Sequence, residues 1–245
     1  MKAIVPHLFT LFNLFLGCLS IVYLFNGNFM IVPHLIFWAC VADFFDGFLA
    51  RILKVESPMG LQLDSLADMV TFGVVPSMVL YHFLLKAFEL PPEQAVMYAA
   101  PAFILALFSA LRLAKFNIDT RQTTGFLGLA TPGSTAFVVS LIPIVETNVF
   151  GLQNLVLNPI FLYTSILVLS LLLIIDLPMF SLKFKNYRWR GNEIRYIFIT
   201  TVFSTLGIVG FAGIPFVILF YVFLSVINNL LLACLLYTSP SPRDA

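Results

Sequence analysis

Long apolar stretches constrain this chain more than any other feature of its sequence. A helix needs about 20 apolar residues to cross the roughly 30 Å hydrocarbon core of a bilayer, and several stretches reach that length. Helices are required because an unpaired backbone cannot face lipid. We therefore predict an all-α polytopic membrane bundle of eight helices, at Leu8–Phe25, Met30–Leu53, Met59–Leu85, Ala95–Ala114, Thr131–Val149, Asn158–Met179, Ile194–Val209 and Ile214–Leu236.

The composition excludes a soluble domain. Of the 245 residues, 60% are apolar and 10% are charged, and the mean hydropathy is +1.01, values that belong to a polytopic membrane protein. We expect membrane lipids and no nucleic acid among the partners of the chain. Residues 1–236 form one membrane-embedded domain in this interpretation. The polar segment 237–245 lacks apolar periodicity, and we predict a disordered or artefactual tail there.

The basic residues predict the orientation. One side of the predicted bundle holds Lys2, Arg51, Lys54, Arg112, Lys115, Arg121, Lys183, Lys185, Arg188, Arg190 and Arg195. The connections on the other side hold Lys86, Glu89, Glu93 and Glu146. Basic loops stay in the cytoplasm, so the N-terminus is expected there, and the even number of helices returns the C-terminus to the same side.

Four aspartates stand out in the middle of the apolar chain. On a helix over Met30–Leu53, Asp43 and Asp46 are three residues apart and share a face. Gly47 and Ala50 fall on the same side of that helix. Two carboxylates therefore lie beside two positions that have almost no side chain.

A second helix is expected after the break at Ser57-Pro58, and on it Gly60, Asp64 and Asp68 recur at intervals of four. Carboxylate faces on consecutive antiparallel helices can converge. Four converging carboxylates repel one another unless cations lie between them, and hard oxygen ligands favour magnesium, manganese or calcium over zinc. Charges are costly in an apolar bundle, so the cluster indicates a functional site.

The arrangement Asp43-x-x-Asp46-Gly47-x-x-Ala50-Arg51, followed after eight residues by Gly60-x-x-x-Asp64-x-x-x-Asp68, resembles the complete signature of the CDP-alcohol phosphotransferase family. The resemblance implies a membrane enzyme with a six-helix core, here followed by two further helices. Such an enzyme moves a phosphate-linked group from a CDP-linked donor to an alcohol and releases CMP. Five segments are similar to the branch that uses CDP-diacylglycerol and L-serine: Pro6–Ile21, Leu63–Ser77, Arg112–Asn117, Gly125–Pro132 and Arg188–Phe198.

The resemblance also implies a role for each signature residue. Asp43, Asp46 and Asp64 would hold one divalent ion, Mg²⁺ or Mn²⁺, and Asp68 would help to bind a second. Asp68 would also accept the proton of the serine hydroxyl. The remaining positions would serve the nucleotide: Arg51 would pair with phosphate, and Gly47, Ala50 and Gly60 would shape the cytidine slot. Because the family is usually dimeric, a homodimer is expected.

Polar residues outside the signature have two interpretations each. Thr10 and Asn13 at the start of the first helix either contact the CDP group or form hydrogen bonds to a neighbouring helix. Arg112, Lys115 and Arg121 either bind an anion, the donor phosphate or the acceptor carboxylate, or reach the interface as topogenic charges. Family members usually carry Asn at position 7, where this chain has His7, so no role is assigned there.

Three alternatives remain open from the sequence. The acceptor is another alcohol, such as glycerol 3-phosphate or an inositol phosphate, if the cations near Arg112 bind a second phosphate. The aspartates are a cation site of a transporter, although such proteins usually contain repeated halves and this chain has one cluster. The aspartates form a buried charge network with Arg51 and Lys54, although carboxylates outnumber those cations.

Overall fold

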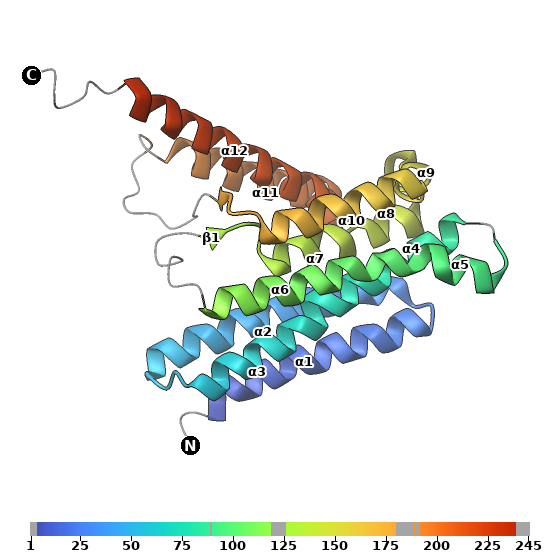
Figure 1. The fold of residues 1–245 in the computed structure, drawn as a ribbon, viewed down its shortest axis with the longest axis horizontal. Helices are drawn as coiled ribbons and strands as arrows, with labels where there is room; N and C mark the ends of the chain where they lie inside the picture. The colour runs from blue at the N-terminus through green and yellow to red at the C-terminus, as the bar shows by residue number, and fades with distance from the viewer. Residues whose placement is uncertain (1–3, 89, 119–125, 180–188, 190–191, 239–245) are drawn as a thin grey trace, which may run out of the picture.

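The computed structural model describes residues 4–88, 90–118, 126–179, 189 and 192–238 of the chain (Figure 1). The elements of the first half are α1 (Ile4–Phe25), η1 (Phe29–Ile31), α2 (Val32–Leu53), α3 (Pro58–Asp68), η2 (Met69–Val74), α4 (Val75–Ala87), α5 (Pro92–Ala99), η3 (Ala100–Phe103) and α6 (Ile104–Ile118). Those of the second half are β1 (Phe126–Leu127), α7 (Thr131–Val139), α8 (Leu141–Thr147), η4 (Val149–Gly151), α9 (Gln153–Val156), α10 (Pro159–Ile174), β2 (Pro178–Met179), α11 (Glu193–Val209), η5 (Gly210–Gly213) and α12 (Ile214–Thr238).

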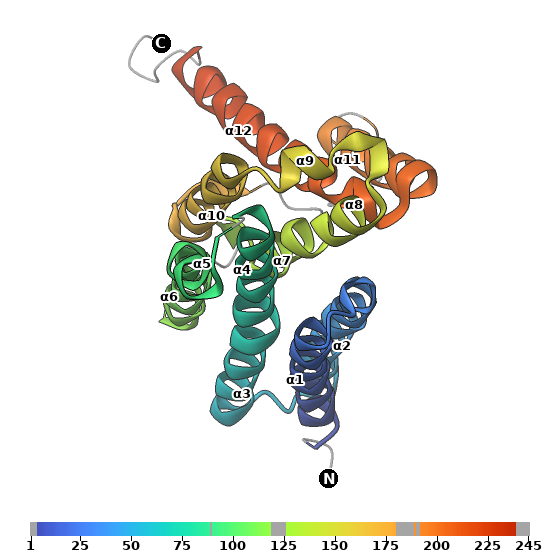
Figure 2. The same ribbon diagram turned by 90° about the vertical axis from the view of Figure 1, so that its right-hand side faces the viewer.

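The turn between α2 and α3 brings the two halves of the aspartate motif together. Helix α2 ends at Lys54, which adopts the left-handed conformation (φ 54°). Ser57 then caps α3, because its Oγ accepts a hydrogen bond from the N–H of Gly60 at 3.0 Å, and Pro58 occupies the first turn, where its missing N–H costs nothing. The predicted break at Ser57-Pro58 is confirmed, and α1 packs against both α2 and α3, which follow it in the bundle (Figures 1 and 2).

A π-helical turn, η2, follows Asp68 directly and joins α3 to α4. Single π turns inside long helices are rare and are frequent at functional sites. The carbonyl of Phe72 lies four residues before Pro76, which has no N–H to donate, and it accepts a hydrogen bond from the Thr135 hydroxyl at 2.9 Å. Helix α7 is thereby tied to the helix that carries two of the aspartates.

A helix lies at each of the eight predicted places, with two differences in shape. The predicted helix over 131–149 is broken at Ser140 into α7 and α8. The predicted helix over 158–179 ends at Ile174, and Pro178–Met179 then pairs with Phe126–Leu127 as a short antiparallel ribbon. Helix α12 continues to Thr238, so the first two residues of the predicted tail are still helical, and the rest of the tail lies outside the described residues.

Five helical stretches of the described chain are long and apolar enough to cross a membrane: Ile4–Phe25, Phe29–Leu53, Pro58–Ala87, Glu93–Ile118 and Glu193–Leu230. The last one turns back at Gly210, whose φ of +63° suits glycine. Phe198 of α11 then packs against Val217 and Leu224 of α12. The two helices predicted at Ile194–Val209 and Ile214–Leu236 are found as α11 and α12.

Candidate functional site

Three of the four aspartates converge at one point between α2 and α3. The carboxylate oxygens of Asp43, Asp64 and Asp68 include one atom from each residue that all lie within 4.8 Å of one another. The site lies toward the end of the bundle where α1 begins, α2 ends and α3 begins (Figure 1). The predicted convergence of the two carboxylate faces is therefore found in the structure.

The donor set fits a hard divalent cation. Asp64 Oδ1 and Asp46 Oδ2 are buried and have no hydrogen-bond partner. Within the described part of the chain, the two ion pairs are Lys86–Glu146 and Lys115–Asp176, so neither neutralises a signature aspartate. Buried carboxylates without a cation are costly, and oxygen donors at this density suit Mg²⁺ or Mn²⁺.

Asp46 lies beside this group rather than within it. Asp46 is 6% exposed, and it lies close enough to Asp64 for the two negative charges to repel each other. Its polar neighbours from α1 are Thr10 and His7. The Thr10 hydroxyl itself donates to the carbonyl of Pro6 at 3.2 Å. Thr10 therefore lies at the site as expected, and a contact to the nucleotide stays a prediction.

Asn13 also lies in the site, where it contacts Asp68, the expected catalytic base. Its side chain is completely buried, and Nδ2 donates a hydrogen bond to Asp68 Oδ1 at 3.2 Å. The interpretation of Asn13 as a residue that bonds to a neighbouring helix is confirmed. A contact from Asn13 to the CDP group stays a prediction.

The structure shows contacts of Gly60 and Arg51 that the spacing of the motif does not predict. A Cβ at Gly60 would lie 3.2 Å from His7 Nε2 and 3.2 Å from Ser57 Oγ, so part of the clearance at Gly60 is taken by the imidazole. The exposed Arg51 turns back on its own helix, and its Nε donates to the carbonyl of Gly47 at 2.9 Å. Ala50 is half-buried on the same helix.

The cations of α6 separate into a buried residue and a paired one. Arg112 is 8% exposed, its Nε has no hydrogen-bond partner, and the charge of Asp68 acts on it. Arg112 is therefore enclosed by neighbouring helices, and both interpretations of its role stay predictions. Lys115 instead pairs with Asp176 at 2.6 Å and donates to the carbonyl of Ile174 at 3.3 Å. Arg121 lies outside the described residues, as do Lys2, Glu89, Lys183, Lys185, Arg188 and Arg190.

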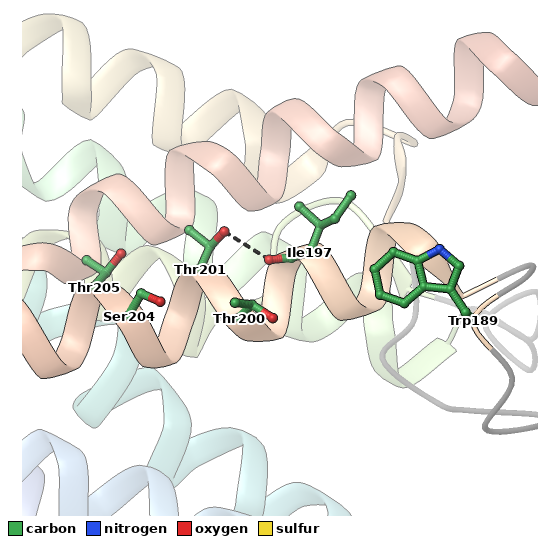
Figure 3. Close-up of a pocket in the computed structure, with 6 residues that line it drawn as sticks. All are labelled: Trp189, Ile197, Thr200, Thr201, Ser204 and Thr205. Carbon is green, nitrogen blue, oxygen red and sulfur yellow. Dashed lines mark hydrogen bonds between the residues drawn. The ribbon is translucent and has the colours of Figure 1, made fainter.

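Two hollows accompany these helices. A small one is lined by Arg112, Lys115, Phe116, Leu127, Leu173 and Ile174, between α6, α10 and β1. A groove of about 430 Å³ runs along α11 and is lined by Trp189, Ile197, Thr200, Thr201, Ser204 and Thr205 (Figure 3). None of the aspartates lines the larger groove, which is therefore not the candidate site.

Sequence reasoning assigned no role in the site to His7, Ser57 or Asp176. His7 and Ser57 lie against Gly60, and Asp176 pairs with Lys115. The position of Ser57 as a helix cap was readable from the Ser-Pro pair. The other two contacts join elements far apart in the sequence, so spacing offered no signal for them.

The fold and the site together define an all-α polytopic membrane protein with a cluster of carboxylates that could hold a metal ion. Comparison with known proteins narrows this class. The family model described as CDP-alcohol phosphatidyltransferase matches residues 3–179. The chain belongs to this family and is an enzyme of its type.

Three relatives from different organisms have the same name. The chain is 28% identical over 203 residues to the CDP-diacylglycerol–serine O-phosphatidyltransferase of Helicobacter pylori, covering 82% of this chain and 80% of the relative. It is 31% identical over 203 residues to the protein of that name from Methanocaldococcus jannaschii, covering 82% and 81%. The Bacillus subtilis protein of the same name is 38% identical over 128 residues, which are 52% of this chain and 69% of the relative.

Proposed function

We propose that the chain transfers the phosphatidyl group of CDP-diacylglycerol to L-serine, giving phosphatidylserine and CMP. The observation that carries the proposal is the buried Arg112 beside a group of three converging carboxylates. The relatives that share most of the chain are named for this reaction. Their agreement supports serine as the acceptor.

In the proposed reaction, the serine hydroxyl oxygen forms a bond to the phosphorus that carries diacylglycerol. The bond from this phosphorus to the CMP oxygen breaks, and CMP leaves. A serine hydroxyl is a poor nucleophile at neutral pH, so a positioned base has to accept its proton. Asp68 is the candidate base, because its carboxylate is 8% exposed and faces the aspartate group.

The carboxylates would also hold the metal. Asp43, Asp64 and Asp68, with Asp46 beside them, have the oxygen donors for Mg²⁺ or Mn²⁺, and the family resemblance implies two ions. A bound divalent ion supplies charge stabilisation for the pyrophosphate and for the leaving CMP. Thr10, Gly47, Ala50, Arg51 and Gly60 would border the nucleotide on this side of the site.

Arg112 would bind the carboxylate of serine. A guanidinium matches a carboxylate with two parallel hydrogen bonds, and a buried one without an Nε partner gains most from such a ligand. A phosphorylated acceptor would need several free cations here. Lys115 is already paired with Asp176, so the described residues favour an acceptor with one carboxylate.

The surroundings of the enzyme are proposed on the same basis. Among the described basic residues, Arg51 and Lys54 lie at the end of α2, Arg112 and Lys115 in the last turns of α6, and Lys86 in the last turn of α4. The ends of α2 and α6 lie on the side of the bundle where α3 begins, and the end of α4 lies on the opposite side (Figure 1). By the positive-inside rule, the active site and the N-terminus face the cytoplasm. We expect a bacterial cytoplasmic membrane and a homodimer.

The decisive experiment measures CMP release by the purified protein in detergent with CDP-diacylglycerol and Mn²⁺, with one candidate alcohol added at a time. L-Serine should support release and phosphatidylserine should form. Release with glycerol 3-phosphate or an inositol phosphate instead would retain the family reaction and overturn the acceptor. A protein that binds Mn²⁺ but releases no CMP with any alcohol would contradict the proposal. Such a result would favour the alternative that the aspartates are the cation site of a transporter. Protection from heat by cytidine nucleotides separates the two, since a cation transporter has no reason to show it.

A further inference from the structure

Asn13 is a fully buried amide between the first helix and the acidic site. Its Nδ2 donates to Asp68 Oδ1 at 3.2 Å, across the contact between α1 and α3. When Asp68 is ionised, as a base has to be, the amide presents its NH₂ group there, because two oxygen atoms without a proton between them would repel each other. The amide oxygen of Asn13 is itself buried and has no hydrogen-bond partner. The residue is thus held in the site by its bond to the carboxylate.

The backbone around Asn13 is fixed from the other side of the contact. The hydroxyl of Thr71, in the π turn that follows Asp68, donates to the carbonyl of Asn13 at 3.2 Å. One turn further along α1, a Cβ at Gly17 would lie 3.1 Å from the Cα of Thr71. The absence of a side chain at Gly17 therefore lets α1 approach η2 closely. The contact sets the distance between Asn13 and Asp68.

The carboxylate of Asp68 has two oxygens, and one of them is occupied by the hydrogen bond from Asn13. Oδ1 of Asp68 accepts from Asn13, so one oxygen of the carboxylate is held by a residue of α1. We propose that Asn13 is a positioning residue that holds Asp68 in the orientation needed to accept the proton of the acceptor alcohol. The proposal rests on the proposed role of Asp68 as the base. It differs from a nucleotide contact, which would act on donor binding.

Steady-state kinetics distinguish a positioning role of Asn13 from a contact between Asn13 and the nucleotide. A positioning residue affects kcat, because the base is misaligned in every bound complex, whereas a nucleotide contact raises the KM for CDP-diacylglycerol. Asn13→Leu retains the shape of the side chain and removes the donor. Asn13→Ala removes both and serves as the second variant. Ser20→Ala is the matched control, since Ser20 is also completely buried on α1 and donates only to the carbonyl of Leu16, at 2.8 Å.

We expect Asn13→Leu to lower kcat about 10- to 100-fold, the usual cost of removing a group that orients a metal-site ligand or base. The KM for CDP-diacylglycerol and the protection from heat by CMP should stay within about twofold of the unsubstituted protein. Asn13→Ala should behave in the same way, and Ser20→Ala should retain full turnover. In an Asp68→Asn background, adding Asn13→Leu should change the residual rate by less than about twofold, because Asn13 acts through Asp68.

Three results would overturn the proposal. One is normal kcat in Asn13→Leu and Asn13→Ala. Another is a raised KM for CDP-diacylglycerol with unchanged kcat, which would establish the nucleotide contact instead. The third is an equal loss from Asn13→Leu with and without Asp68→Asn, which would show independent action. Failure of the proposed function is seen separately, in the unsubstituted protein: if serine gives no CMP, the variants are compared with whichever alcohol does.

Discussion

Two long apolar helical stretches of this protein, Pro58–Ala87 and Glu193–Leu230, have opposite surroundings. In the most apolar window of the first, 61% of the residues are buried, against 11% in the second. The first carries Asp64 and Asp68 and includes the π turn. The second carries a stripe of hydroxyl side chains along an open groove (Figure 3). Polar residues occur in both, but only enclosure by other helices fixes their positions.

The family match divides the chain in the same way. It ends at residue 179, before α11 begins. Helices α11 and α12 have a small apolar cluster of their own, formed by Phe198, Val217 and Leu224. We infer that the chemistry belongs to the part of the chain up to β2, and that the final hairpin contributes packing. The following predictions test this division.

The largest effect is expected from Asp64→Asn. The substitution removes a charged ligand whose Oδ1 is buried and unpaired, so metal affinity and turnover should both fall. The expected loss of kcat is about 100-fold or more, above the roughly 10- to 100-fold cost of altering groups that only orient metal ligands. CMP release titrated with Mn²⁺ measures both effects, and EDTA should abolish release by the unsubstituted protein. Retention of near-normal turnover at low Mn²⁺ would remove Asp64 from the metal site.

The next effect compares two arginines. Arg112→Gln should raise the KM for serine by about 100-fold, equivalent to about 2–3 kcal/mol, because a buried cation that pairs with a carboxylate is lost. The KM for CDP-diacylglycerol should change little. Arg195→Gln in α11 is the control: Arg195 donates to Asn192 near the start of the hairpin, and serine kinetics should be unaffected. A similar rise in both variants would contradict the proposed acceptor site.

The helices and the carboxylate cluster were predictable from the sequence for a physical reason. Apolar runs near membrane length leave few structures other than helices, and Ser57-Pro58 marks a boundary through local chemistry. Intervals of three and four place Asp43 beside Asp46, and Asp64 beside Asp68, on helix faces. These features depend only on neighbours along one helix.

Contacts between distant segments were not predictable in the same way. The burial of Arg112 depends on how α10 and the β1–β2 ribbon cover α6, and the pairing of Lys115 with Asp176 joins residues 61 positions apart. Pro76, just after η2, indicates a distortion of the helix, because it has no N–H for the carbonyl of Phe72, but it does not specify a π turn. The contact between Asn13 and Asp68 depends on that turn and on Gly17, so spacing alone left its role open.

A smaller effect, on stability, comes from two glycines in the contrasted regions. A Cβ at Gly17 would meet Thr71 of η2, whereas a Cβ at Gly207 of α11 has no atom within 4 Å. Gly17→Ala should lower the free energy of unfolding by about 1–3 kcal/mol, the usual cost of overpacking. Gly207→Ala should be neutral or stabilise the helix by up to about 1 kcal/mol. Thermal unfolding in one detergent compares them, and equal effects would show that α11 is packed as tightly as α1.

The smallest effect is expected from the hydroxyls of the α11 groove. Thr201 donates to the carbonyl of Ile197 at 2.9 Å, within its own turn, so Thr201→Val loses a local bond and retains the side-chain shape. We expect turnover within about twofold and a change in stability within about 0.5 kcal/mol, as for surface substitutions. Thr135→Val is the matched core variant, because Thr135 is completely buried and ties α7 to the carbonyl of Phe72. Loss of that bond should leave a buried carbonyl unpaired and cost about 1–3 kcal/mol. If Thr201→Val reduced CMP release by much more than about twofold, or lowered stability as strongly as Thr135→Val, the groove would belong to the catalytic part of the molecule. The division between the two regions would then be wrong.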